Sequence, residues 1–366
     1  MDYCAHDLSL DQLCGQLLVV GYPSDQVPSS LFDDISIGRR AGVILFKRNL
    51  PTLARAYDAC QRLIGAAPQD TPVLVSIDEE GGRVRRLPPP FIQLPAMMRL
   101  ASLDDTSLLQ RAGEVVGAGL RALGIQLNFA PVLDIHTRPE NPVIGDRAFG
   151  TTAQDVSRGA LCYWRGLRSA GVLGCGKHFP GHGDTSIDSH IALPSVATSI
   201  ERLKQVELVP FCDAIRSGMQ CLMSAHIVCE SMDASAPATL SYRVSTGLLR
   251  EELGFEGVLF SDDLEMGAIG QRATIGQAAV QAVRAGCDVL LVCALEQRQN
   301  DVHAALVQEA QRDSGFRTRC EQAAERSISL RRGHRPDPAP SWEQALARVD
   351  SDQSRELQSE LARAIR

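Results

Sequence analysis

Short, almost uninterrupted apolar runs recur along the chain and alternate with stretches of helical period. Segments 106–124 and 275–286 repeat apolar residues at the spacing of an amphipathic helix. Apolar runs without polar alternation are typical of parallel strands that are covered on both faces. The runs that we interpret as strands are 17–22, 42–46, 72–77, 126–132, 172–176, 221–226, 257–261 and 288–293.

The alternation of strand and helix predicts an α/β fold, and its length favours a barrel. Eight β/α units over about 300 residues fit a (β/α)8 barrel, which usually needs about 250 residues before insertions. An open, doubly wound sheet alternates in the same way and stays the alternative, because the pattern alone does not separate the two folds. We expect a single-domain TIM-type barrel over residues 1–333. The proline-rich break RRGHRPDPAP introduces a polar stretch, so we expect a C-terminal helical extension over 334–366.

Composition excludes several classes of protein. The 366 residues are 44% hydrophobic and 22% charged, as in ordinary globular proteins. The net charge of −7 and the lack of a Lys/Arg block argue against a nucleic-acid partner. No apolar run approaches the roughly 20 residues of a membrane span. The beginning of the chain does not resemble a secretory signal, and the 11 scattered cysteines form no CxxC pair. We therefore expect a cytoplasmic protein without a membrane partner.

Polar and ionisable residues gather where the expected strands end. Asp78 follows 72–77, and Arg147 lies in the segment after 126–132. The segment KHFPGHGDTSIDSH, residues 177–190, follows 172–176, and SDDLEMG ends the run at 257–261. Barrel enzymes build their active sites at the carboxyl ends of the strands, so this placement indicates an enzyme. One of Asp262 and Asp263 should face the pocket, but strand alternation does not choose between them.

Residues 177–190 allow three interpretations, and the first two are weak. Residues 171–178 match the GxxxxGK of a phosphate loop, but His178 replaces the Ser or Thr that would hold magnesium. The proline at 180 also stops any helix after Lys177. Three histidines and two aspartates are plausible metal ligands, yet they fit no recognised spacing, and the Lys177 charge disfavours a cation. We expect no metal site and no cofactor.

The third interpretation is an acid–base centre. In an extended segment, residues i and i+2 point the same way, so Asp188 can lie beside His190. A carboxylate next to the imidazole raises its pKa, which makes a proton donor usable near neutral pH. A structural Asp–His pair is the simpler alternative. We expect His182 and Asp184 to shape the loop and His226 to line the pocket.

Several segments together resemble glycoside hydrolase family 3, and within it the NagZ-type bacterial β-N-acetylglucosaminidases. The resemblance runs in order from about residue 10 to about 330, and its fourteen-residue histidine segment is the most specific part. The family fold is a (β/α)8 barrel, sometimes followed by a second α/β domain that we do not expect here. The matching segments are IDEEGGRVRR, NFAPVLDI, VIGDRAFG, KHFPGHGDTSIDSH, PATLSYRVSTGLLREELGFEG and FSDDLEMGAI.

The resemblance implies a role for each candidate residue. Asp262 would be the nucleophile that forms a covalent glycosyl-enzyme. His190 would be the general acid and then the base, assisted by Asp188, whereas most retaining glycosidases use two carboxylates. The residues implied to hold the N-acetylglucosamine ring are Asp78, Arg86, Arg147, Lys177 and His178.

The implied activity is that of a monomeric, exo-acting β-N-acetylglucosaminidase in cell-wall recycling. Its small-molecule substrate would be a muropeptide that carries N-acetylglucosamine on anhydro-N-acetylmuramic acid. Three alternatives stay open: a phosphorylase or transglycosylase that uses the same intermediate, a metal-dependent hydrolase, and an inactive sugar-binding barrel. If His190 is not the acid, Glu79 and Glu80 are the runner-up acids, with Glu80 the next candidate. Glu79 should point away from Asp78 by strand alternation.

Overall fold

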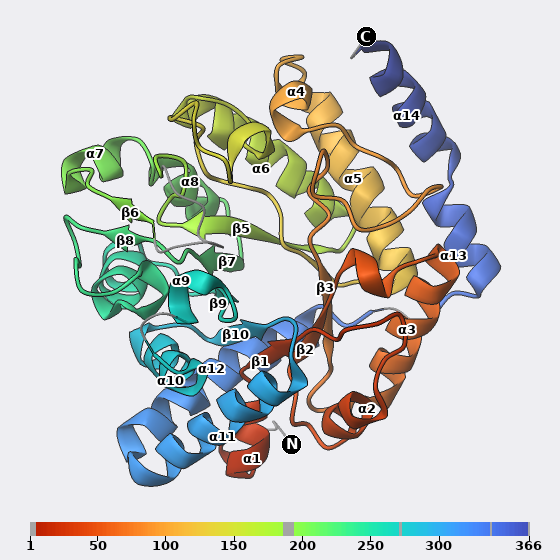
Figure 1. The fold of residues 1–366 in the computed structure, drawn as a ribbon. Coiled ribbons are helices and arrows are strands. Elements are labelled where there is room, and N and C mark those ends of the chain that lie inside the picture. The colour runs from red at the N-terminus through yellow and green to blue at the C-terminus, as the bar shows by residue number, and fades with distance from the viewer. Residues whose placement is uncertain (1–4, 186–193, 271–272, 337–338, 365–366) are drawn as a thin grey trace.

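Within the described residues, eight parallel strands close into a barrel, and helices surround it (Figure 1). The computed structural model describes residues 5–185, 194–270, 273–336 and 339–364. Neighbouring strands follow the order β1-β10-β9-β7-β5-β4-β3-β2, and β1 pairs with β10 to close the ring. The predicted (β/α)8 barrel is therefore confirmed, and the open doubly wound sheet is excluded.

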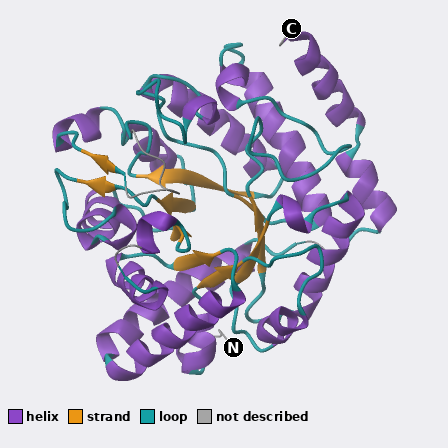
Figure 2. Cartoon of the chain, viewed as in Figure 1, coloured by secondary structure: helices purple, strands orange, loops and turns teal. Residues whose placement is uncertain are grey.

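All eight apolar runs that the sequence pattern marks as strands contribute a barrel strand. Figure 2 shows these strands as an orange ring inside the helices. Their bounds are β1 Leu18–Val20, β2 Gly42–Leu45, β3 Leu74–Ile77, β4 Leu127–Asn128, β5 Leu173–Phe179, β7 Cys221–Ser224, β9 Val258–Asp263 and β10 Val289–Val292.

The uninterrupted apolar character of these strands has a direct structural reason. Successive side chains of a strand point to opposite faces, and both faces are buried here. In β10, Val289 and Leu291 belong to the core cluster inside the barrel, together with Phe129 and Phe260, whose rings pack edge to face. Leu290 and Val292 belong instead to the larger core between the barrel and its helices.

The helices cover the outside of the barrel. The two predicted helices are confirmed as α5 and α10, and α5 begins at the capping side chain of Asp105 and ends at Gly124 with φ +93°. The α-helices are α1 Leu10–Gly15, α2 Ser29–Ser36, α3 Leu53–Ala66, α4 Met97–Ala101, α5 Thr106–Leu123, α6 Ala153–Ser169, α7 Ile200–Gln205, α8 Val209–Arg216, α9 Gly267–Gly270, α10 Ile275–Ala285, α11 Glu296–Arg312, α12 Ser314–Gly333, α13 Trp342–Val349 and α14 Asp352–Ala364.

A few shorter elements complete the chain. The strands β6 Ser195–Val196 and β8 Val228–Cys229 form a small parallel sheet outside the barrel, which the sequence pattern did not predict. A π-helix runs over η5 Arg243–Glu252. The 3-10 turns are η1 Ala5–Asp7, η2 Lys47–Asn49, η3 Gly145–Arg147 and η4 Ala238–Leu240.

The C-terminal tail packs on the outside of the barrel. Its helices α13 and α14 lie against α5, and α13 also contacts α3 (Figure 1). The Trp342 ring lies 5.7 Å from the Tyr57 ring, and Leu357 and Leu361 are buried. The helical character of the tail is as expected, whereas a domain boundary at residue 333 stays a prediction.

Candidate active site

A cavity of about 250 Å³ opens at the carboxyl ends of the barrel strands. Its charged lining comes from several strands: Asp78 and Glu80 follow β3, Lys177 lies on β5, and Asp262 lies at the end of β9. The structure therefore brings together all the predicted sugar-binding residues and the predicted nucleophile. These residues are Asp78, Arg86, Arg147, Lys177, His178 and Asp262.

Four of the charged side chains form one ion-pair network, which we call the catalytic-face cluster: Asp78, Glu80, Arg147 and Lys177. Nζ of Lys177 lies 2.7 Å from Asp78 Oδ1 and 2.6 Å from Glu80 Oε1. Arg147 donates two hydrogen bonds to the same Glu80 carboxylate, from Nε and from Nη2, each at 2.8 Å. This geometry fixes the cationic heads against the cavity wall.

The cluster keeps Glu80 ionised. Burial alone would raise the Glu80 pKa, but the charges of Arg147 and Lys177 outweigh it and hold the pKa well below its ordinary value. Burial alone would lower the pKa of Lys177, yet Asp78 and Glu80 raise it. The ion pairs with Arg147 and Lys177 therefore argue against Glu80 as the proton donor.

Both aspartates at the end of β9 line the cavity, so the expectation that only one would face it is wrong. They differ in what their carboxylates bind. Burial would raise the Asp262 pKa, but the charges of His226 and His178 hold it below the ordinary value. Asp263 accepts the backbone N–H groups of Glu265 at 3.0 Å and Cys293 at 3.3 Å, and burial raises its pKa to about 6. Asp262 is thus the better ionised of the two and the one whose carboxylate is less occupied by the backbone.

His178 is oriented by a carboxylate that the sequence analysis did not single out. Asp134 is completely buried, and its Oδ2 lies 2.6 Å from Nδ1 of His178. The same carboxylate accepts the backbone N–H groups of His178 and His182. A proton held on Nδ1 leaves Nε2 of His178 as the ring nitrogen available to a ligand. The only sequence signal is that Asp134 follows the fourth apolar run.

The loop after β5 is shaped by close backbone contacts. A Cβ atom at Gly183 would lie 1.6 Å from the carbonyl oxygen of Ile135, so only glycine fits there. Nδ1 of His182 lies 2.8 Å from the Thr185 hydroxyl, and Asp184 accepts from the Thr198 hydroxyl at 3.0 Å. These contacts agree with the loop-shaping roles expected of His182 and Asp184, although His182 also lines the cavity.

Two other residues lie apart from the cavity. His226 is completely buried: Nε2 donates to the carbonyl oxygen of Asp263 at 2.9 Å, and Nδ1 lies 2.8 Å from the Thr239 hydroxyl. It is not among the described lining residues, so the expectation that it lines the pocket is corrected. Glu79 was predicted to point away from Asp78. Asp78 lines the cavity and Glu79 does not, and the Glu79 carboxylate instead accepts the backbone N–H groups of Arg86 and Leu87.

Asp188 and His190, the predicted acid–base pair, lie outside the described residues. In the part of the chain that is described, no group of three or more His, Cys, Asp or Glu side chains is placed to hold a metal ion. None of the described helices is both long enough and apolar enough to cross a membrane.

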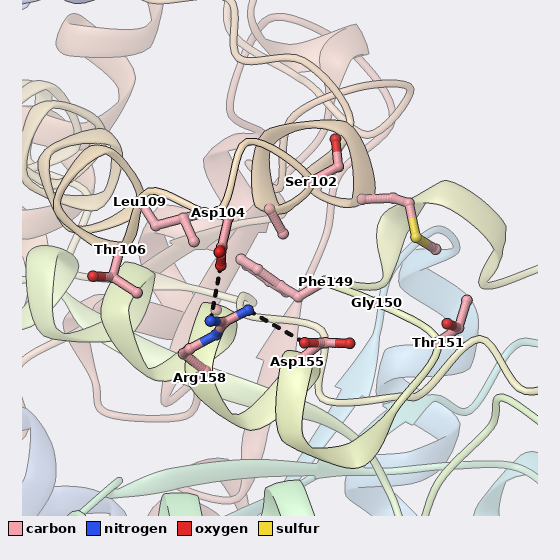
Figure 3. A pocket seen from close by; sticks show the side chains of 12 residues that line it. Ser102, Asp104, Thr106, Leu109, Phe149, Gly150, Thr151, Asp155 and Arg158 are labelled. Carbon is pink, nitrogen blue, oxygen red and sulfur yellow. Dashed lines mark hydrogen bonds and ion pairs between the residues drawn. The ribbon is translucent and has the colours of Figure 1, made fainter.

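A second cavity, of about 320 Å³, has a different character (Figure 3). It lies between α4, α5 and the start of α6. Its charged groups pair with each other: Arg158 lies 2.8 Å from Asp104 and 3.3 Å from Asp155. This cavity lacks the convergence of strand ends and the surplus of polar groups that mark the catalytic cavity.

Comparisons with known proteins point to one family. The Glycosyl hydrolase family 3 N terminal domain matches residues 9–330. A β-hexosaminidase of Methylobacillus flagellatus is 36% identical over 279 residues, which cover 75% of this chain and 79% of that protein. A family 3 β-N-acetylglucosaminidase from Paenibacillus sp. str. FPU-7 superposes with a TM-score of 0.91 at 39% identity, covering 98% of this chain and 69% of that one. NagZ from Neisseria gonorrhoeae in complex with N-trifluoroacetyl-D-glucosamine superposes with a TM-score of 0.80 at 29% identity, covering 96% of this chain and 98% of that one.

Proposed function

Since the chain belongs to glycoside hydrolase family 3 and is a β-N-acetylhexosaminidase, we propose that it releases N-acetylglucosamine with retention through a covalent glycosyl–Asp262 intermediate. The observation that carries this proposal is the position of Asp262: an ionised carboxylate at the end of β9, in the cavity that Asp78, Arg147 and Lys177 also line. A carboxylate held ionised in such a cavity is suited to attack the anomeric carbon of a bound sugar.

The sugar ring would be held by the catalytic-face cluster, with His178 and Arg86 as further partners. Asp78 can accept hydrogen bonds from ring hydroxyls, whereas Lys177 and Arg147 can donate them. The cavity of about 250 Å³ is small beside ligand pockets of about 300–1,000 Å³, which supports a single terminal sugar and hence exo action. The similar NagZ of Neisseria gonorrhoeae binds an N-acylated glucosamine.

In this mechanism His190 protonates the leaving oxygen and then activates water, with Asp188 raising the pKa of the imidazole. The proposal for this pair rests on the family resemblance. It is supported by the state of Glu80, because a glutamate held ionised by two cations is not available as the acid.

The proposed substrate is a muropeptide in which N-acetylglucosamine is linked to anhydro-N-acetylmuramic acid, cleaved during peptidoglycan recycling. The family resemblance supports this choice of aglycone. The cytoplasmic location and the monomeric state expected from the sequence stay predictions.

Trapping tests the nucleophile. A fluorinated N-acyl glucosaminide should leave its sugar on the enzyme, and peptide mapping should find the label on Asp262. A label on Asp263, which lies one residue away on the same strand, would refute the assignment.

Leaving-group dependence tests the acid–base pair. His190→Ala should slow hydrolysis of a natural disaccharide far more than release of an activated phenol, which needs no protonation. With the phenol, a burst should precede slow turnover, and azide should accelerate that turnover because it attacks without a general base. Equal losses on both substrates without an azide effect would make the Asp188–His190 pair structural.

A further inference from the structure

The loop between β3 and α4, residues 78–96, carries three side chains of the catalytic cavity, and we call it the β3 loop. Asp78, Glu80 and Arg86 all line the cavity. Asp78 and Glu80 stand at the beginning of the loop, whereas Arg86 comes after the chain has turned back through a short antiparallel bridge. The relative positions of these side chains therefore depend on how the two sides of the turn are held together.

Glu79 joins the two sides of this turn from inside the protein. Its main chain is fixed to the barrel, because the Asn128 side chain of β4 accepts from the Glu79 N–H and donates to the Glu79 carbonyl oxygen, each at 2.9 Å. Its buried carboxylate reaches across the turn, where one oxygen accepts the N–H groups of Arg86 at 2.8 Å and Leu87 at 3.0 Å. One side chain thus links the barrel wall to the returning segment that carries the Arg86 guanidinium.

Hydrogen bonds continue from this returning segment to the C-terminal tail. The side-chain amide of Gln93 donates to the carbonyl oxygens of Leu87 at 3.2 Å and Phe91 at 2.8 Å. The backbone N–H of Gln93 donates in turn to the side-chain oxygen of Gln358 on α14 at 2.9 Å. Because α14 packs on α5, the tail holds the outer side of the β3 loop against the barrel. This support comes from beyond residues 9–330, which match the family domain.

From these contacts we propose that Glu79 is a positioning residue for the sugar-binding side chains, and that Gln93 and Gln358 extend this support to the tail. The inference rests on the proposed function, because it takes Asp78 and Arg86 as ligands of the sugar. The Glu79 carboxylate is bound to the backbone of the loop, so it acts on the sugar only through the residues that it holds.

The expected effect of releasing the β3 loop is a loss of affinity for the sugar. Side chains that bind a ligand must be held close to their productive geometry by supporting contacts. The nucleophile Asp262 lies on β9 and is held separately from this loop. A variant with a loosened β3 loop should therefore bind the sugar more weakly and lose less in kcat, which is the pattern of lost uniform binding.

Glu79→Leu tests the inner end of this path. Leucine accepts no hydrogen bond, so the N–H groups of Arg86 and Leu87 lose their shared partner. The KM for 4-nitrophenyl β-N-acetylglucosaminide and the inhibition constant of N-acetylglucosamine should both rise about tenfold or more, because small misplacements of positioning groups are costly. Partial unfolding would lower kcat and leave KM unchanged, so the two constants separate positioning from stability. Glu79→Gln keeps an acceptor oxygen and should retain most of the affinity.

Gln358→Ala tests the outer end of the path and decides the question if Glu79→Leu does not fold. Gln358 is half-buried on α14, and its truncation removes the acceptor of the Gln93 N–H. The same two constants should rise about two- to fivefold, as expected from the loss of one hydrogen bond. Glu360→Ala is the matched control, because it removes from the same helix an ion pair of 2.8 Å to Arg111 of α5, and it should leave both constants unchanged.

The outcomes separate this inference from the proposed function. If Asp78→Asn weakens sugar binding but Glu79→Leu and Gln358→Ala keep the wild-type KM, positioning by Glu79 is refuted and the proposed sugar site stands. If Asp78→Asn itself keeps wild-type kinetics, the proposed sugar site fails, and the positioning role fails with it. Equal rises of KM in Gln358→Ala and Glu360→Ala would refute the path through Gln358, because the tail would then act through its packing alone.

Discussion

Two groups of buried charges lie at opposite ends of the barrel strands. Both combine carboxylates with cationic side chains, but one group holds the fold together and the other lines a cavity. At the amino end of β10, Asp288 is completely buried and accepts from Arg250 at 2.6 Å, Arg319 at 2.8 Å and Arg326 at 3.3 Å. We call this group the Asp288 cluster. Its carboxylate also accepts the backbone N–H of Leu259, so protein groups occupy both oxygens.

The catalytic-face cluster also combines carboxylates with cations, but it borders a cavity. Lys177 and Arg147 hold Glu80, whereas the Asp78 side chain keeps 16% of its surface exposed and lines the pocket. The Asp288 cluster fastens α12 and η5 to the barrel. The catalytic-face cluster offers charges to a ligand. The difference is that protein groups surround the Asp288 carboxylate, whereas a cavity borders the catalytic-face cluster. Substitutions in the first cluster should therefore change stability, and substitutions in the second should change activity.

The largest expected effect is on activity, at Asp262. Asp262→Asn keeps the side-chain shape but removes the attacking charge, so kcat should fall by roughly 10⁴-fold or more. Asp263→Asn is the matched control: it alters a carboxylate that binds the backbone of Glu265 and Cys293 and should keep far more activity. Steady-state kinetics on a nitrophenyl glycoside, with circular dichroism to verify folding, measures both. A larger loss of kcat in Asp263→Asn than in Asp262→Asn would make Asp263 the nucleophile instead.

The Asp288 cluster should respond in stability instead. Asp288→Ala leaves three arginines without their shared carboxylate, and breaking a buried ion pair costs about 3–5 kcal/mol of unfolding free energy. Urea denaturation should show this loss, whereas kcat and KM of the folded enzyme should stay within about twofold of wild type. An activity loss without a stability loss would remove the distinction between the two clusters.

An intermediate effect is expected where the catalytic-face cluster meets the sugar. Asp78→Asn weakens hydrogen bonds to a charged group, each of which contributes about 1.5–3 kcal/mol, so kcat/KM should fall roughly tenfold to a hundredfold. Asp58→Asn, on the exposed surface of α3, is the control and should leave kinetics unchanged. Wild-type kinetics in Asp78→Asn would place the sugar elsewhere.

The smallest effect is a pH dependence that contrasts Glu79 with Glu80. Burial raises the Glu79 pKa from 4.5 to about 7, although bonds from Arg86 and Leu87 oppose the shift. Below pH 4.5 the carboxyl is protonated in both the folded and the unfolded chain, so its burial does not reduce the free energy of unfolding through charge. Above pH 7 the carboxyl is ionised in both states, and burying the charge lowers the free energy of unfolding. Glu79→Gln should therefore gain melting temperature relative to wild type as pH rises from about 4.5 to about 7.

Glu80 should behave in the opposite way. Its pKa is lowered, so it contributes stability that is present above pH 4.5 and is lost as the pH falls further. Glu80→Gln should therefore have a lower melting temperature than wild type above pH 4.5, and this difference should shrink as the pH falls further. Parallel pH profiles of the two variants would contradict the assignment.

The sequence predicted the barrel well because its strands are buried on both faces. Each strand then appears as an apolar run that local inspection can find, as with the residues around Leu291. The β6–β8 sheet was missed because strands of two residues each leave no such run.

Side-chain roles were harder to predict where distant segments decide them. The choice between Asp262 and Asp263 depends on the backbone N–H of Cys293, which lies thirty residues further along the chain. Glu80 was a candidate acid until Arg147 and Lys177, from two other segments, fixed its charge. Asp134 was passed over because its partner His178 lies forty-four residues away.

The closure of the barrel between β1 and β10 has a consequence for how the enzyme is made. Leu18 pairs with Leu290, and Arg331 of α12 donates to the carbonyl oxygens of Ala41 and Pro72. A chain growing from its amino end cannot form these contacts until more than three quarters of it has been synthesised, and pairings this distant in sequence form slowly. We therefore expect the active site to be assembled late, after synthesis has passed β10, so that nascent chains are without activity and depend on protection from aggregation until the ring closes.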